Sequence, residues 1–231
     1  MIGILGGMGT QAGLDFCNKL AKLNRGKLDQ QYPMFVLYNK SNTPKRPENL
    51  MKYYNVLKAL VDGCKMLEKN KCKFIVMPCN TAHYWHDDIQ KKIKIPLLSM
   101  PKEVYLYTKK TCKKNSTIGI LCTEATLKTK VYNNYFDKNY KLISPKKEIQ
   151  RNSVNKSIKL VKMGKVKEAE IALRTAVKYL IKKKCKKIIL GCTELPIAIF
   201  AYKSFRKAKQ SKLFIDPNLL LAEVCMKRYK R

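Results

Sequence analysis

The sequence predicts an α/β fold of two pseudo-symmetric lobes, each a parallel sheet with helices on its faces. Short apolar runs alternate with segments of helical period along the chain, which is the order of elements in parallel sheets. The stretch "KCKFIVMPC", which begins at Lys71, recurs as "KCKKIILGC" from Lys184, and the matching cysteines are 113 positions apart. The "IGIL" run at Ile2 recurs at Ile118. We therefore expect a duplicated unit, with the active site in the cleft between the lobes, because such sheets bind ligands beyond the carboxyl ends of their strands.

The first lobe is expected to span residues 1–100. Its opening run "MIGIL" is bounded by "GGMG", which predicts a buried strand that ends in a tight turn. A helix that ends at Gly26 follows, and apolar residues at helical spacing predict a second helix from Glu48 to Leu67. The Pro- and Asn-rich "NTPKRPEN" is a predicted loop. Further strands are expected in "YPMFVLYN", "KFIVM" and "IPLLSM".

The second lobe is expected to span residues 101–213. "STIGILCTEAT" predicts a strand that runs into a turn, "SVNKSIKLVKMG" a short helix that ends at Gly164, and "KVKEAEIALRTAVKYLIKKK" a longer amphipathic helix. "KKIILGC" and "KLFIDP" are the remaining predicted strands. The final helix, "NLLLAEVCMKR", lies within residues 214–231, and we expect this segment to complete the first lobe.

Composition restricts the class of protein. The 231 residues have an ordinary hydrophobic share of 45%, which favours a folded protein over a disordered one. No apolar run approaches the length of a membrane span, and the N-terminus lacks the features of a secretory signal. Nine cysteines without CxxC spacing favour neither a disulfide framework nor a zinc ribbon. We expect a cytoplasmic protein without a membrane partner, in which most thiols are buried.

The charge balance is strongly basic, with 49 Lys and Arg against 16 Asp and Glu and a formal net charge of +33. Such an excess is typical of proteins that bind nucleic acid or anionic membranes. Most of the basic residues are Lys spread along the whole chain, whereas bidentate contacts to phosphate or bases favour Arg. We therefore expect only non-specific electrostatic binding of nucleic acid. A Lys-rich nucleic-acid-binding protein on the same scaffold is the alternative from another functional class.

Two of the nine cysteines have a distinctive setting. Cys79 and Cys192 each follow a predicted buried strand and precede a predicted helix start. Backbone N–H groups and the helix dipole at such a position stabilise an anion, so we expect a lowered thiol pKa. A thiolate on one side of a substrate can act as a base and a thiol on the other side as an acid. That pair suits the removal of a Cα proton from one face of an amino acid and its return to the other, which is racemisation.

The motifs "IGILGGMG", "MPCNTAH" and "ILGCTELP" resemble, in this order and spacing, those of the aspartate/glutamate racemases, and most closely the cofactor-independent aspartate racemases. The resemblance spans nearly the whole chain. It implies two similar α/β lobes, an acid/base pair formed by Cys79 and Cys192, and neither pyridoxal phosphate nor a metal. It also implies a homodimer and an acidic amino-acid substrate, with aspartate ahead of glutamate or a broad specificity.

The resemblance further implies cationic groups that hold the substrate carboxylates. The matching positions are Arg46 in "NTPKRPEN" and Lys162 in "KLVKMGKVK", with Lys165 as an alternative register for the second. Polar residues at the strand ends are expected to donate hydrogen bonds, and the turn from Gly7 to Gly9 to form the floor of the site. The predicted substrate-binding residues are therefore Met8, Arg46, Asn80, Thr81, Thr123, Lys162 and Thr193.

Other functions fit parts of the same motifs. "GMGTQA" from Gly7 matches the G-x-G-x-x-A dinucleotide fingerprint, but the next predicted strand ends at Asn39 without the required acidic residue. Cys79, His83 and His86 would share one helix face as metal ligands. We expect instead that His83 bonds locally and that His86 is exposed. Related two-lobe enzymes isomerise maleate, racemise hydantoins or decarboxylate malonates, and the presence of both cysteines favours a two-base racemase.

Overall fold

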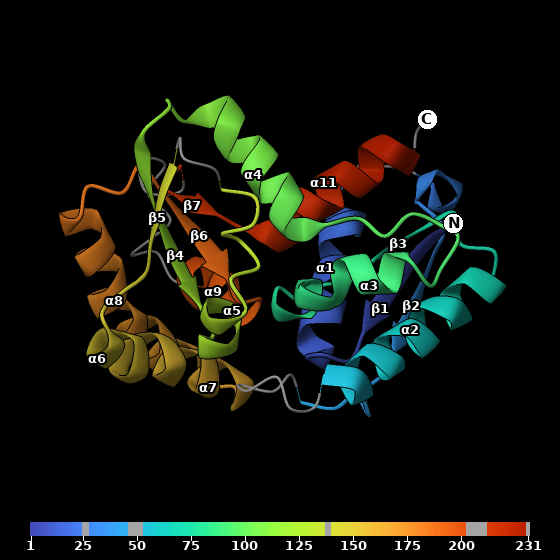
Figure 1. The fold of residues 1–231 in the computed structure, drawn as a ribbon, viewed down its shortest axis with the longest axis horizontal. Helices are drawn as coiled ribbons and strands as arrows, with labels where there is room; N and C mark the ends of the chain where they lie inside the picture. Colours follow the sequence, from blue (N-terminus) through green and yellow to red (C-terminus); the bar gives the residue numbers. More distant parts are fainter. Residues whose placement is uncertain (25–27, 46–52, 137–139, 202–211, 230–231) are drawn as a thin grey trace. The chain divides into compact units, whose positions relative to one another are not determined.

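The computed structural model divides into two compact units, which are coloured along the sequence in Figure 1. One unit comprises Met1–Glu103 with Asn218–Arg231, and the other comprises Val104–Pro217. Each unit contains one parallel sheet and α-helices, so the predicted α/β class with two parallel sheets is confirmed. The residues that the structure describes are 1–24, 28–45, 53–136, 140–201 and 212–229.

The sheet of the first unit has the strand order β2-β1-β3. Its register pairs Gly6 with Asn39 and Ile4 with Val76, so the carboxyl ends of these parallel strands lie along one edge. The elements of this unit are β1 (Ile2–Gly6), α1 (Thr10–Leu23), η1 (Asp29–Gln31), β2 (Phe35–Asn39), α2 (Tyr53–Lys69), β3 (Phe74–Val76), η3 (Thr81–Trp85) and α3 (His86–Gln90). The two boundaries between the units fall within α4 (Met100–Thr111) and α11 (Pro217–Tyr229).

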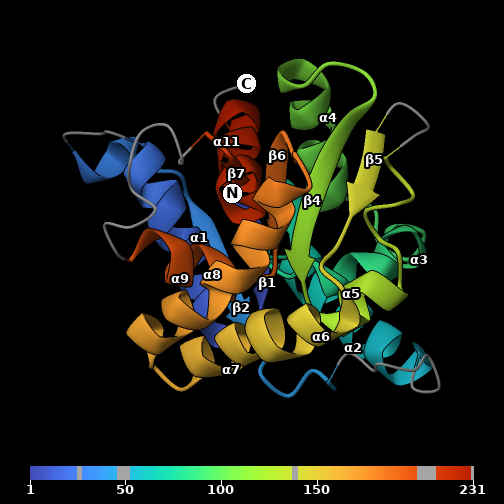
Figure 2. The same ribbon diagram turned by 90° about the vertical axis from the view of Figure 1, so that its left-hand side faces the viewer.

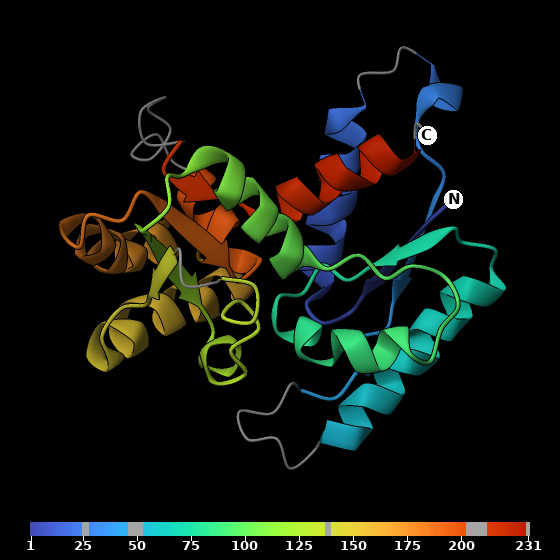
Figure 3. The ribbon, with the colours of Figure 1, turned by 45° about the horizontal axis from the view of Figure 1, so that its top comes forward.

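Helices cover both faces of this sheet, as Figure 3 shows for α1 and α11 on one side and α2 on the other. Successive strand residues point to opposite faces. Ile2 and Ile4 belong to one apolar cluster with Phe16 of α1 and Leu221 of α11. Leu5 belongs to a second cluster, to which α2 and α3 contribute. Burial on both faces explains why the sequence of β1 is a continuous apolar run.

The sheet of the second unit has the strand order β5-β4-β6-β7, and Figure 2 shows β5, β4 and β6 side by side. Cys122 pairs with Gly191, so the carboxyl ends of β4 and β6 are level. The elements are β4 (Ser116–Cys122), α5 (Glu124–Lys128), β5 (Tyr140–Ile143), α6 (Lys147–Ile149), the π-helix η4 (Gln150–Asn155), α7 (Lys156–Lys162), α8 (Val166–Lys182), β6 (Lys187–Gly191), α9 (Glu194–Phe200) and β7 (Phe214–Ile215).

The topology repeats between the two units. β2-β1-β3 and β5-β4-β6 have the same order and direction. The counterpart of β7 in the first unit is a single parallel bridge from Ile75 to Leu97. The predicted strand "IPLLSM" is therefore wrong beyond that bridge. Pro96 has no N–H to donate, and α4 begins at Met100, which leaves too few residues for a longer ladder.

The first cysteine of each sequence repeat has a packing role. A Cβ atom on Gly3 would lie 3.2 Å from Sγ of Cys72, and one on Gly119 would lie 3.2 Å from Sγ of Cys185. Each thiol thus packs against a glycine in the central strand of its sheet. Of the two cysteines in each repeat, only the second lies at the carboxyl edge of the sheet. In both copies, therefore, the first cysteine has a packing role and the second is the candidate for catalysis.

Within the part of the chain that the structure describes, no helix combines the length and apolar character needed to cross a bilayer.

Candidate active site

The carboxyl edge of the first sheet carries Cys79. The chain leaves β3 at Val76, and Cys79 N–H donates to the carbonyl of Met77 at 2.7 Å, which turns the backbone sharply before η3. Cys79 has only 7% of its surface exposed and belongs to the same apolar cluster as Met8, which follows the end of β1. Asn80 and Thr81 are also buried in this turn. The structure therefore brings four of the predicted residues to the same edge of this unit.

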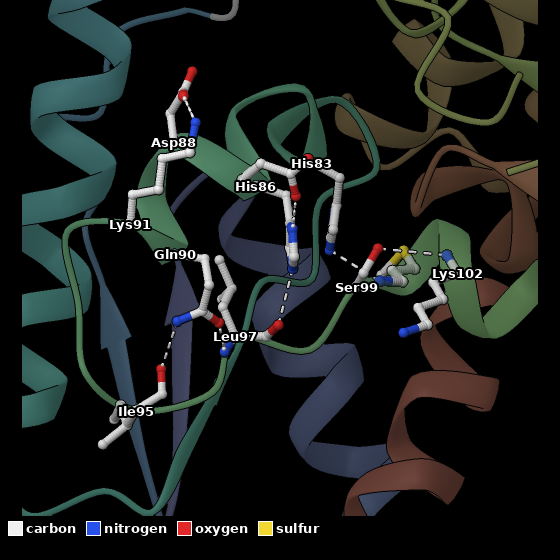
Figure 4. A network of polar contacts seen from close by, with 11 residues as sticks. His83, His86, Asp88, Gln90, Lys91, Ile95, Leu97, Ser99 and Lys102 are labelled. Carbon is white, nitrogen blue, oxygen red and sulfur yellow. Dashed lines mark hydrogen bonds and ion pairs between the residues drawn. The ribbon is translucent and has the colours of Figure 1, made fainter. Parts of the chain in front are cut away.

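His83 connects Cys79 to the start of α4, as part of the polar network in Figure 4. Its Nδ1 lies 2.9 Å from the carbonyl oxygen of Cys79, and its Nε2 lies 3.1 Å from the backbone nitrogen of Met100. A carbonyl only accepts and an amide N–H only donates, so Nδ1 carries the proton and Nε2 accepts. The local bonding expected of His83 is thus present, and its neutral tautomer is defined by two backbone groups.

His86 is half-buried, which corrects the expectation that it is exposed. Its Nε2 lies 2.9 Å from the carbonyl oxygen of Leu97, and its Nδ1 lies 2.8 Å from Oδ1 of Asp87. The loop back towards α4 covers the ring, a contact distant in sequence that the local pattern did not indicate (Figure 4). Among the described residues, no group of three or more His, Cys, Asp or Glu side chains is placed to hold a metal ion.

Burial lowers the pKa of His83 to about 4, although its backbone hydrogen bonds oppose the shift. The unfolded chain binds a proton on this histidine below about pH 6.5, while the folded protein does not until about pH 4. The free energy of unfolding should therefore fall by about 3 kcal/mol from this group as the pH drops through that window. Urea unfolding of the wild type and of His83→Asn at several pH values measures the slope.

The asparagine variant should lose this part of the pH dependence, because its amide stays neutral. His86→Gln is the matched control, since it removes the other of the two histidines and should leave most of the His83 contribution in place, because burial is the main cause of the shift and the charge of His86 only adds to it. Parallel pH profiles for the wild type and His83→Asn would contradict the assignment of a neutral buried ring.

The carboxyl edge of the second sheet carries Cys192, which directly follows β6 and is 8% exposed. Its Sγ–H donates to Oε2 of Glu194 at 2.9 Å. Thr193 Oγ1 donates to the same oxygen at 3.2 Å, and Nζ of Lys162 lies 3.6 Å from Oε1. A single carboxylate thus connects the thiol, a hydroxyl and an ammonium group. Glu194 was not among the predicted site residues, although its place two residues after the motif cysteine was a signal.

The expected lowering of the thiol pKa is wrong for Cys192. Burial, followed by the negative charge of Glu194, raises the pKa of this thiol well above its usual range, while a hydrogen bond from the Glu194 backbone N–H and the charge of Lys162 oppose the shift. The helix that follows the thiol begins with Glu194 itself, so a carboxylate occupies the turn where N–H groups and the helix dipole were expected to dominate.

Thr123 lies beside Cys192 in this edge, because each directly follows one of the paired residues Cys122 and Gly191. It caps α5: its Oγ1 accepts from Thr126 N–H at 3.2 Å and lies 3.0 Å from the Thr126 hydroxyl. The structure therefore gathers Thr123, Cys192, Thr193 and, through Glu194, Lys162.

The remaining predicted cations are placed differently. Lys165 is exposed at the N-cap of α8, so the ion pair at the site is made by Lys162 rather than by the alternative register. Arg46 lies outside the described residues.

Glycine at position 7 is required for a local structural reason. With a φ of 85°, Gly7 lies against the backbone of Lys40, which follows β2. Its lack of a side chain is needed for that internal approach, and the predicted role of this turn as the floor of the site stays a prediction.

Comparisons with known proteins show that this chain is similar to racemases. The model of the Asp/Glu/hydantoin racemase family matches residues 5–225. The broad specificity amino-acid racemase RacX of Bacillus subtilis is 30% identical over 199 residues, which are 84% of this chain and 86% of that protein. A glutamate racemase of Sulfurihydrogenibium is 28% identical over 171 residues, which are 72% of this chain and 64% of that protein.

Among solved structures, the aspartate racemase of Picrophilus torridus has a TM-score of 0.82 and 29% sequence identity, over 99% of this chain and 94% of that chain. The similarity thus extends over both sheets. Because the family model extends from β1 into α11, this chain belongs to the Asp/Glu/hydantoin racemase family and is an enzyme of the isomerase class.

Proposed function

We propose that this protein racemises an acidic amino acid without a cofactor, and that Cys79 and Cys192 form its acid/base pair. The observation that carries the proposal is the duplicated cysteine at the carboxyl edge of each sheet, in a chain of a racemase family. Both thiols are at most 8% exposed, so proton transfer at either one is shielded from bulk water. The packing role of Cys72 and Cys185 leaves these two as the motif cysteines available for chemistry.

The reaction needs one base and one acid. One cysteine thiolate takes the Cα proton, and the electron pair of the broken C–H bond passes into the substrate carboxylate as an enediolate. The S–H of the other cysteine then supplies a proton to the opposite face, so its S–H bond breaks as the new C–H bond forms. Donors such as the hydroxyls of Thr81 and Thr193, together with Lys162 and Arg46, are proposed to stabilise the negative charge.

Aspartate is the first candidate substrate. The Picrophilus torridus protein, named an aspartate racemase, is similar over almost all of both chains. The names of the Sulfurihydrogenibium and Bacillus subtilis relatives support glutamate and a broad specificity as alternatives. A basic protein also attracts a dicarboxylic substrate, although a net charge of +33 attracts any anion.

Proton NMR in D2O tests the proposal directly. Purified, reduced protein is incubated separately with L-aspartate and L-glutamate without an added cofactor, and the products are separated on a chiral column. We expect loss of the Cα proton signal together with the appearance of the D-enantiomer, faster for aspartate. Turnover of glutamate alone would reassign the substrate. The absence of exchange with either acid would contradict the proposal, and salt-sensitive RNA binding in its place would favour the nucleic-acid-binding alternative.

A further inference from the structure

Glu194 is the buried acidic group in direct contact with a candidate catalytic thiol. Its side chain is 12% exposed, and its two oxygens have different partners. Oε2 accepts hydrogens from Cys192 and Thr193, at 2.9 and 3.2 Å. Oε1 faces the ammonium group of Lys162 at 3.6 Å. Two donated hydrogens and a nearby cation are the partners of an ionised carboxylate.

An ionised Glu194 makes a thiolate at Cys192 costly. Both groups would be negative, within hydrogen-bond distance and largely out of water, and like charges in such a place are not ionised together. Lys162 is the opposing positive charge, but its side chain is 59% exposed and so is screened by solvent. A negative charge on Cys192 also acts on the buried Tyr132, whose pKa is raised well above its usual value mainly by burial.

From these contacts we infer that Glu194 is a positioning residue that holds Cys192 as the protonated thiol, so that Cys192 serves as the acid in the resting enzyme. The inference rests on the proposed function and assigns unequal roles within it. The raised pKa of Cys192 agrees with the contact geometry.

The proton balance follows. The Cys192 S–H bond breaks when its proton forms the new Cα–H bond, which leaves a thiolate beside the Glu194 carboxylate. Lys162 offsets part of that charge, and a proton from solvent restores the Cys192 thiol. The Cys79 thiol, which holds the abstracted Cα proton, releases that proton to solvent. The free enzyme therefore returns to one protonation form, and one enantiomer reacts with that form directly.

Alkylation of Cys192 tests the inference without turnover. Iodoacetamide reacts with the thiolate, so the extent of labelling against pH, read by mass spectrometry of the Cys192 peptide, reports the ionisation of this thiol. Glu194→Gln keeps an amide oxygen that accepts the S–H but removes the charge. We expect its labelling at about pH 8 to be faster than in the wild type by about tenfold or more, because one pKa unit corresponds to a tenfold change in thiolate.

Three further variants define the origin of the effect. Glu194→Asp should restore much of the wild-type profile, because it keeps the charge. Lys162→Met should slow the labelling, because it removes the positive charge that offsets part of the negative charge of Glu194. The side chain of Lys162 is exposed. Glu170→Gln is the matched control: Glu170 is a buried glutamate of the same unit that forms a bidentate ion pair with Arg174, and its loss should leave Cys192 unchanged.

The pH dependence of kcat/KM for racemisation is the second readout. The basic limb of the profile should move to lower pH in Glu194→Gln by the same shift as the labelling. A uniformly lower rate with the profile unmoved would indicate a merely structural role and overturn the inference. If the wild type racemises and Glu194→Gln moves neither profile, the racemase stands and the role of Glu194 is wrong. If labelling shifts but the wild type exchanges no Cα proton, racemisation is wrong and the control of the Cys192 thiol stands.

Discussion

Replacing either Cys79 or Cys192 by alanine is expected to lower kcat/KM for racemisation by about 10³-fold or more, because each loss removes one of the two proton-transfer groups. Combining the two substitutions should cost little beyond either one alone, since the thiols act as a unit. Polarimetry or chiral chromatography of the products gives the rates, and circular dichroism checks that the fold persists. Wild-type turnover by either alanine variant would remove that cysteine from the mechanism.

The duplicated repeat supplies matched controls for this experiment. Cys72→Ala and Cys185→Ala remove the other cysteine of each copy, whose thiol packs against Gly3 or Gly119 in the central strand. They should reduce stability and leave kcat/KM near its wild-type value. In D2O, Cys192→Ala should still exchange the Cα proton of one enantiomer without inverting it, because Cys79 remains as a base. Cys79→Ala should exchange the Cα proton of the other enantiomer much more slowly, because Glu194 holds Cys192 as a thiol. Such exchange, of opposite enantiomers in the two variants, would show which thiol serves which face.

Gly7→Ala is expected to destabilise the protein by about 3 kcal/mol or more. A Cβ at this position would lie 2.2 Å from the carbonyl carbon of Lys40 and 2.4 Å from its oxygen. Those are backbone atoms, so no side-chain rotation relieves the clash, and the φ of 85° adds strain for any residue with a side chain. Urea unfolding followed by circular dichroism measures the loss.

Gly164→Ala is the matched control for Gly7→Ala. Gly164 has a similar φ of 77°, but a Cβ there meets no atom within 4 Å. Its substitution carries only the backbone strain, about 1 kcal/mol. Equal losses from the two variants would show that the contact with Lys40 is relieved by a shift of the β2 end.

The sheets could be predicted from the sequence because a strand that is buried on both faces is apolar at successive positions. β1, β4 and β6 each contain an uninterrupted apolar run, and a repeat with a cysteine shortly after each of two strands places Cys79 and Cys192 at the sheet edges. The strand β5 went unpredicted, because its four residues include only a short apolar run. The helix α4 was missed because its lysines and tyrosines weaken the helical apolar period.

The candidate site was predicted less completely, for a physical reason. Motif spacing indicates which residues leave a strand, but not which partner a turn brings back. Glu194 lies two positions from Cys192, and only the local backbone directs its carboxylate onto the thiol. His86 was expected to be exposed because the local sequence gave no sign of a partner. The partner is the carbonyl of Leu97, in a loop eleven residues further along the chain. Contacts of this kind decide the thiol pKa, so its direction could not follow from helix position alone.

The first unit is formed by two segments that are separated in sequence, Met1–Glu103 and Asn218–Arg231, and this has a consequence for biosynthesis. Leu221 and Cys225 of α11 belong to the apolar cluster that covers one face of β1. The unit of Val104–Pro217, by contrast, is a single continuous segment. On the ribosome, the later-starting unit therefore has its full sequence available first, while the sheet of the first unit waits for α11 to emerge before that face is covered. Until α11 is translated, this apolar face is a surface on which a chaperone would act.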